Sequence, residues 1–216
     1  MRANPSVFSF ACFGLALLLI PAQSAATQTL NSKTKEYKTM TNYQAWIEED
    51  YAPVKTFSGA MDGTEVTVTR YEDNTDNPFI LGGEHITFVS DKGGKLKGLA
   101  RILGLYQLEN TTLPTENESK NIAMNFLESN APDLLQNMKV QWIKPHDEEV
   151  MIDNKKIIIT GMKVKCRNLD DGKYFWVIVG HDNSVMVFER DIVWDFFKAG
   201  RQTEKWLHDS WLKSQI

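Results

Sequence analysis

Histidine and cysteine, the side chains that most often bind zinc, are few in this 216-residue chain. They are four histidines and two cysteines: His85, His146, His181, His208, Cys12 and Cys166. A zinc site places two or more such ligands four residues apart on a helix or opposite each other on a hairpin, and these histidines show no such spacing. The Gly-x-Ser-x-Gly motif of many hydrolases does not occur either. We therefore predict no catalytic residue, no metal ligand and no cofactor.

Two local groupings come nearest to a nucleophilic site. His85, Ser90 and Asp91 are close in the sequence, but the segment alternates between apolar and polar residues, which puts His85 and Ser90 on opposite faces of one strand. Cys166 shares one face of a second alternating segment with Met162 and Val164. This pattern predicts a buried, inert thiol, and a reactive or intermolecular thiol is the alternative.

Aromatic and charged residues near the carboxyl end are better suited to contacting a partner. Four of the six tryptophans lie in the last 41 residues: Trp176, Trp194, Trp206 and Trp211. Trp206 is central in an amphipathic segment and is predicted to anchor the core. We predict Trp194, Trp211, Arg190 and Asp195 as a candidate partner surface. The alternative is that the aromatic residues pack in the core and the charged residues pair with one another.

The segments that must position these residues follow two hydrophobic periods. A period of two predicts strands at residues 65–71, 84–90, 95–102, 140–143, 150–152, 157–167, 174–180 and 185–191. Helices are predicted near residues 41–51, after the capping box of Thr115 and Glu118, and at residues 202–213. The predicted fold class is α+β, with an antiparallel meander sheet packed on a helix. Similar hairpins at residues 85–101 and 175–190 suggest two related α+β units.

The amino-terminal segment predicts where the protein works. Residues 1–26 contain Arg2, an apolar run and then small residues, which is the pattern of a cleaved secretory signal peptide. Residues 27–40 are predicted as a flexible lead-in, 41–112 as an amino-terminal α+β unit and 113–216 as a second α+β unit with a terminal helix. We expect a secreted or periplasmic protein with no stable membrane insertion after cleavage.

A helix motif, a proline break and a set of closing strands follow one another in the second unit. The residues that carry this order are Ala123, Phe126, Leu127, Pro132, Asp133, Leu134, Asp171, Gly172, Lys173, Tyr174, Val177, Ile178, Val179, Asp182 and Val185. Over residues 120–195 they resemble the PepSY and YcdB/YpeB group of extracytoplasmic domains. The turn at residues 181–184 departs from that group, which usually has an Asp and a Gly there. The resemblance implies a sheet packed on a helix that acts by binding or inhibition, without catalytic residues.

Composition and resemblance together favour a non-enzymatic module that binds or inhibits a secreted or envelope protein or its peptide. The formal net charge of −4 comes with no basic stripe, so nucleic acid is not an expected partner. The alternatives are an extracytoplasmic hydrolase and a small-ligand-binding protein. A deep pocket with convergent His, Asp or Glu side chains would favour the enzyme, whereas exposed aromatic residues or an open strand edge would favour the binder.

The tryptophans near the carboxyl end allow the core interpretation to be tested. Replacing a buried Trp by Ala costs about 3–5 kcal/mol, whereas replacing an exposed Trp changes stability by about 0.5 kcal/mol or less. We predict that Trp206→Ala lowers the unfolding midpoint strongly and that Trp211→Ala, nearer the free end, lowers it less. Thermal unfolding of both variants checks this, and an unchanged midpoint for Trp206→Ala would overturn the core assignment.

Overall fold

The computed structural model describes residues 43–73, 79–195, 197–198 and 200–215. The predicted signal peptide at residues 1–26 and the lead-in at residues 27–40 lie outside the described residues. All of the described residues belong to one compact unit, residues 38–216. Within this part of the chain, no helix is long and apolar enough to cross a membrane.

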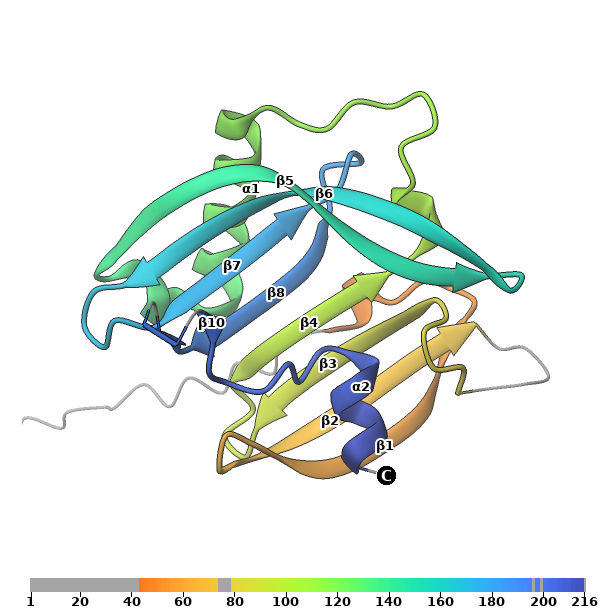
Figure 1. The fold of residues 1–216 in the computed structure, drawn as a ribbon, viewed down its shortest axis with the longest axis horizontal. Helices are drawn as coiled ribbons and strands as arrows, with labels where there is room; N and C mark the ends of the chain where they lie inside the picture. The colour runs from red at the N-terminus through yellow and green to blue at the C-terminus, as the bar shows by residue number, and fades with distance from the viewer. Residues whose placement is uncertain (1–42, 74–78, 196, 199, 216) are drawn as a thin grey trace, which may run out of the picture. The chain divides into compact units, whose positions relative to one another are not determined.

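The centre of the fold is an eight-stranded antiparallel sheet with the strand order β1-β2-β3-β4-β8-β7-β6-β5 (Figure 1). Its strands are β1 (Tyr51–Met61), β2 (Thr64–Asp73), β3 (His85–Asp91), β4 (Leu96–Ile102), β5 (Met138–Ile152), β6 (Lys155–Asn168), β7 (Tyr174–Val179) and β8 (Val185–Ile192). Each half of the chain forms its own four-stranded meander. The two meanders join where β4 pairs with β8, so both predicted units contribute to one sheet. The predicted α+β class is confirmed.

Turn chemistry explains the hairpins. The β3–β4 turn contains Gly94 at a φ of 78°, which glycine adopts without steric cost. The β5–β6 turn consists of Asp153 and Asn154 at φ of 50° and 60°. Two consecutive residues with positive φ form the type of tight turn that matches the twist of the flanking strands.

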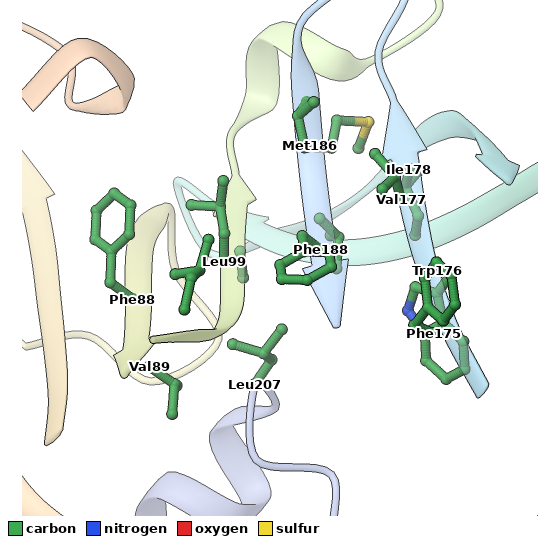
Figure 2. Packing of buried hydrophobic residues seen from close by; sticks show 14 of the residues in the cluster. Phe88, Val89, Leu99, Phe175, Trp176, Val177, Ile178, Met186, Phe188 and Leu207 are labelled. Carbon is green, nitrogen blue, oxygen red and sulfur yellow. The ribbon is translucent and has the colours of Figure 1, made fainter. Parts of the chain in front are cut away.

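One face of the sheet packs against helix α1 (Glu116–Asn130) and the 3-10 helix η1 (Tyr43–Trp46). The predicted capping box is present, because the Thr115 side chain accepts from the Glu118 backbone N–H and the Glu118 carboxylate accepts from the Thr115 N–H at 2.8 Å. Phe126 of α1 lies 5.2 Å from Phe188 and 5.4 Å from Trp46 between ring centroids. Figure 2 shows Phe88, Leu99 and Phe188 on neighbouring strands. This aromatic layer joins both halves of the sheet.

The opposite face is covered in part by the carboxyl-terminal segment. Leu207 packs on Gly98 of β4, where its side chain leaves no room for a Cβ atom without a shift (Figure 2). Helix α2 (Asp209–Gln215) then lies over β1 and β2, with Trp211 against Phe57 at 6.5 Å between ring centroids. Trp206 is only 1% exposed, which places it in the core as predicted.

The predicted terminal helix at residues 202–213 is too long, since α2 begins only at Asp209. Residues before it are held in an irregular path by Arg201, whose guanidinium donates to the backbone oxygens of Thr203 and Glu204. Two short strands, β9 (Trp194–Asp195) and β10 (Gly200–Arg201), precede this path and pair with each other. Both of the carbonyl groups that accept from Arg201 lie before α2, which begins at Asp209.

Two further predictions were wrong at segments next to or containing a proline. A helix was expected near residues 41–51, but of the described residues 43–51 only η1 is helical, and Pro53 lies inside β1 at a register shift. Residues 140–143 and 150–152 were expected as two strands, but they are parts of the single strand β5, which contains Pro145. Both prolines are on the end strands of the sheet, where a missing N–H leaves no ladder bond unmade.

A fully buried arginine fastens the carboxyl-terminal helix to the sheet. The Arg70 guanidinium of β2 pairs with Glu72 at 2.5 Å and with Asp209 of α2 at 2.7 Å. It also donates to the Ile80 carbonyl oxygen at 2.8 Å. Glu72 in turn accepts from the backbone N–H groups of Phe79 and Ile80. Arg70 and Glu72 together therefore connect β2, the loop before β3 and α2.

Removing Arg70 should leave the buried carboxylate of Glu72 and the partly buried carboxylate of Asp209 without a counter-charge. We expect Arg70→Met to lower the free energy of unfolding by about 3–5 kcal/mol. Lys92→Met is the control, because the Lys92 and Glu65 side chains are 73% and 57% exposed and such pairs contribute about 0–1 kcal/mol. Urea unfolding of both variants measures the difference. Equal losses in the two variants would show that the buried network contributes no more than a surface pair.

Candidate functional site

The β5–β6 hairpin extends well past the rest of its half of the sheet. Strand β7 pairs with β6 only from Met162 to Arg167, so residues 155–161 of β6 pair with β5 alone. This outer part of the hairpin reaches the loop before β3, where the Met151 N–H donates to the Gly82 carbonyl oxygen at 2.7 Å. The hairpin therefore forms an arm that connects the two halves of the chain outside the sheet ladder (Figure 1).

A cavity of about 580 Å³ lies between this arm, the sheet and the carboxyl-terminal segment. Ala100, Ile102 and Val187 form an apolar part of its floor on β4 and β8. The arm contributes residues 146–149, and the terminal segment contributes Trp194 together with residues 198, 200–201, 205 and 207–209. The volume is in the range of pockets that hold small ligands or short peptides.

Lys163 and Trp176 form the most distinctive part of the cavity wall. The Lys163 side chain crosses the Trp176 indole with its ammonium 3.9 Å from the ring centroid. Lys163 is only 9% exposed, and among the described residues its ammonium has no carboxylate within ion-pair distance. Burial lowers the pKa of Lys163 to about 8, although Glu148 and Glu189 act against this shift. The cavity thus contains a cation that is not neutralised by direct contact.

Two acidic side chains near Lys163 are already engaged. Glu189 of β8 pairs with Arg201 at 2.6 Å, and both side chains are less than a tenth exposed. Glu148 of the arm accepts from the His146 ring at 3.2 Å. Burial would raise the pKa of Glu148, but the hydrogen bond from His146 and the nearby His208, His146 and Lys163 hold it below its ordinary value. The Glu148 carboxylate is therefore ionised at neutral pH.

The two other histidines of the cavity are neutral at neutral pH. Burial lowers the pKa of His208, although Glu148 and Glu189 act in the opposite direction. Burial and the nearby Arg70 lower the pKa of His85 to about 4. His85 Nδ1 lies 2.8 Å from the Gly83 carbonyl oxygen, while its Nε2 has no hydrogen-bond partner in the described part of the chain. In this tautomer Nδ1 donates and Nε2 is an acceptor.

A cluster of aromatic rings surrounds a second lysine beside the cavity. The Lys165 ammonium lies 4.4 Å from the Trp194 ring centroid, 4.6 Å from that of Tyr174 and 5.5 Å from that of Trp142. Trp142 and Trp194 are each 37% exposed. Burial lowers the pKa of Lys165. Since Trp194 also lines the cavity, this cluster presents aromatic surface next to it.

The four residues of the predicted partner surface do not lie together. Trp194 is exposed and lines the cavity, and Asp195 beside it accepts from the backbone N–H groups of Phe197 and Lys198. Arg190 is 3% exposed on the α1 side of the sheet, where it holds Asp133 through two hydrogen bonds of 3.1 and 2.5 Å. Trp211 is 6% exposed, and its indole N–H donates to Glu204.

The sequence predictions missed Lys163, Glu148 and His208 as members of one site. Lys163, Lys165 and Arg167 alternate with Val164 and Cys166 on β6, and this row of cations on one strand face was a usable signal. Nothing local brings His146, Glu148 and His208 together, because the arm and the terminal segment meet only in the folded protein. Cys166 is buried as predicted, and burial raises the pKa of its thiol to about 12.

Comparisons with known proteins were made by family, by curated sequence and by solved structure. No family model matches this chain. No curated protein and no solved structure matches it either. The antiparallel sheet and its two α-helices are compatible with a PepSY-like domain. Within the described residues, no group of three or more His, Cys, Asp or Glu side chains could hold a metal ion.

The burial of the Lys163 ammonium leads to a prediction about how the free energy of unfolding depends on pH. Below pH 8 the Lys163 amine is protonated in both the folded and the unfolded chain, and burying this charge lowers the stability of the folded state. We expect Lys163→Met to raise the free energy of unfolding at pH 7 by roughly 1–3 kcal/mol. This gain should shrink as the pH rises from about 8 toward the ordinary lysine pKa of 10.5, where the wild-type penalty disappears.

Lys156→Met is the matched control, because Lys156 is on the same strand with its side chain 60% exposed. Because this side chain is exposed, its replacement should change the free energy of unfolding by about 0.5 kcal/mol or less at each pH. Urea unfolding at pH 7, 8, 9 and 10 measures both variants. A Lys163→Met variant that is less stable than wild type at pH 7 would contradict the prediction.

Proposed function

We propose that this protein is a secreted or periplasmic, non-enzymatic module that binds a peptide segment of a secreted or envelope protein. The proposal keeps the PepSY-like resemblance, which implies binding or inhibition. The cavity between the arm and the terminal segment is the proposed binding site. The observation that carries the proposal is that this cavity combines an unpaired cation, Lys163, with an indole wall and with the outermost strand of the sheet.

The chemistry of the cavity wall supports a peptide as the ligand. Trp176 and Trp194 offer flat apolar surface with indole N–H donors, which suits mixed polar and apolar ligands. Lys163 offers a positive charge in a desolvated position, where an ionic hydrogen bond is stronger than at an exposed one. Ala100, Ile102 and Val187 add apolar contact on the floor. A peptide presents all three matching groups within a few residues.

A hydrolase remains the second candidate function. It is favoured by the convergence of His146, Glu148 and His208 on one cavity, the condition stated above for an enzyme. His208 is neutral at pH 7 and could accept a proton from water. The described lining residues include no Ser, Thr or Cys to supply a hydroxyl or thiol nucleophile, and water is the attacking group that a neutral His208 could activate.

One experiment separates the two candidates. The full chain is incubated with a pool of octapeptides randomised over all residues and labelled with fluorescein at the amino terminus. We expect the fluorescence anisotropy of the pool to rise and Trp194→Ala to weaken binding about tenfold or more, because an exposed aromatic wall of the cavity is lost. Mass spectrometry of the recovered pool should show intact octapeptides. Cleaved octapeptides would favour the hydrolase, and unchanged anisotropy at every protein concentration would reject peptide binding.

Trp142→Ala is the matched control for the Trp194 variant, because the two tryptophans are equally exposed, at 37% each. Trp142 is exposed on β5 and contacts Lys165, but it is not among the residues that line the cavity. Its replacement should leave the anisotropy titration within about twofold of wild type, since it removes no cavity contact. Equal losses in the two variants would place the binding surface outside the cavity.

A further inference from the structure

Strands β5 and β6 carry positive charges on the face of the sheet that points away from α1. Phe188 of β8 contacts Phe126 of α1. The register places Val177 of β7 opposite Phe188, and Val164 of β6 opposite Val177, so all three share the α1 face. Neighbouring residues of a strand point to opposite faces. Lys165, which follows Val164, therefore points away from α1.

The register pairs residues of β5 directly with residues of β6 on this face. The pairs are Lys139↔Arg167, Trp142↔Lys165 and Lys144↔Lys163. Two of them place like charges directly opposite each other, an arrangement that lowers the stability of a sheet. Lysines on an edge strand such as β5 prevent contact between sheet edges, but β6 is paired on both sides. The cations of β6 therefore need another explanation.

The positive charges on this face are not neutralised by acidic side chains. We call it the cationic face, and it consists of Lys139, Trp142, Lys144, Lys165 and Arg167. Within the described part of the chain, none of its four cations forms an ion pair. Lys139, Lys144 and Arg167 are exposed. Such a cluster attracts anions although the formal net charge of the chain is −4, because its field is local.

Two exposed indole rings lie among these cations. Trp142 of the cationic face and Trp194 of β9 are each 37% exposed. The Lys165 ammonium lies 5.5 Å from the Trp142 ring centroid and 4.4 Å from the Trp194 ring centroid. A group that stacks on either indole therefore lies close to the Lys165 ammonium.

Exposed indoles beside unpaired cations suit a flat ring that itself carries a negative charge. Sugar rings pack their C–H faces on indoles, and the carboxylate or sulfate group of an acidic sugar is attached directly to the ring. Lysine ammonium groups donate strong hydrogen bonds to such anions. In a nucleic acid, a sugar separates each phosphate from the base that stacks on an aromatic ring. The short distance between ring and charge on this face therefore favours an acidic sugar over a nucleotide.

We propose that the cationic face, together with Trp194, binds an acidic polysaccharide whose sugar rings carry carboxylate or sulfate groups. Trp142 and Trp194 stack on the sugar rings, and Lys165 between them pairs with the acidic groups. No residue of the cationic face is among the described residues that line the cavity, to which Trp194 also contributes. The inference is therefore a second binding function, independent of peptide binding in the cavity.

The test compares five octamers that differ in ring and charge. Octagalacturonate and a sulfated glucose octamer are acidic sugars, a neutral glucose octamer lacks the charge, octaglutamate lacks the rings, and a deoxythymidine octamer is a nucleic acid. Each carries fluorescein at one end, and its anisotropy is measured with the full chain. We expect at least one acidic sugar to bind about tenfold more tightly than each of the other three octamers. Equal or tighter binding of any of those three, or no binding of either acidic sugar, would overturn the proposal.

Substitutions locate the binding surface. Lys165→Met removes the cation between the two indoles, and Trp142→Ala removes one indole. We expect each to weaken binding of the preferred acidic sugar about tenfold. Lys156→Met is the control, because Lys156 is on the same strand outside the cationic face with its side chain 60% exposed, and its replacement should keep the affinity within about twofold. Wild-type affinity in the Lys165 or the Trp142 variant would show that the sugar binds elsewhere.

Sodium chloride provides a measurement on the unchanged chain. Raising its concentration about tenfold shortens the range over which exposed charges attract each other. Binding of the preferred acidic sugar should weaken as a result, because the cations of the cationic face are largely exposed. An affinity that does not change with salt would contradict the role of the lysines.

Discussion

The buried guanidinium of Arg70 is the interaction on which the candidate site depends. It is held by Glu72 of its own strand, by the carbonyl oxygen of Ile80 and by Asp209 of α2. Asp209 also accepts from the Gly82 N–H, and the Gly82 carbonyl oxygen accepts from Met151 at the end of the arm. One peptide segment therefore connects the helix that ends the chain with the hairpin that forms the opposite wall of the cavity. The fully buried Arg70 guanidinium therefore positions both walls of the cavity. It cannot move without leaving the carboxylates of Glu72 and Asp209 without a counter-charge.

Most of the secondary structure could be predicted because its signals are local. The turn residues Asp153 and Asn154, the capping box at Thr115 and the alternation along β3 each determine the backbone of their own segment. The errors have a common physical source. Pro53 and Pro145 normally interrupt a strand, but a strand at the edge of a sheet tolerates them, and edge position depends on the tertiary fold. No local pattern distinguishes an edge strand from a loop that contains proline.

The candidate site could be predicted only in part. Trp194 was predicted as a partner residue and lines the cavity, but the other three predicted residues lie elsewhere or serve other contacts. Lys163, Glu148 and His208 come from three segments that are distant in the sequence. Their meeting depends on how far the β5–β6 hairpin projects and on where α2 begins. Both follow from contacts of Met151, Arg201 and Asp209 that no periodicity encodes.

The junction between β4 and β8 has a consequence for how the chain acquires its structure. The two meanders are joined there by three residue pairs, Gly98↔Glu189, Leu99↔Phe188 and Ala100↔Val187, whose members are about 90 residues apart in the sequence. During synthesis the first meander is complete long before β8 has been made. Until then, the edge of β4 that pairs with β8 has no partner strand. Pairings of such long sequence separation form slowly, and an uncovered strand edge invites contact with other chains in the meantime. β8, the last strand of the second meander, therefore also covers the strand edge that the first meander exposes on β4.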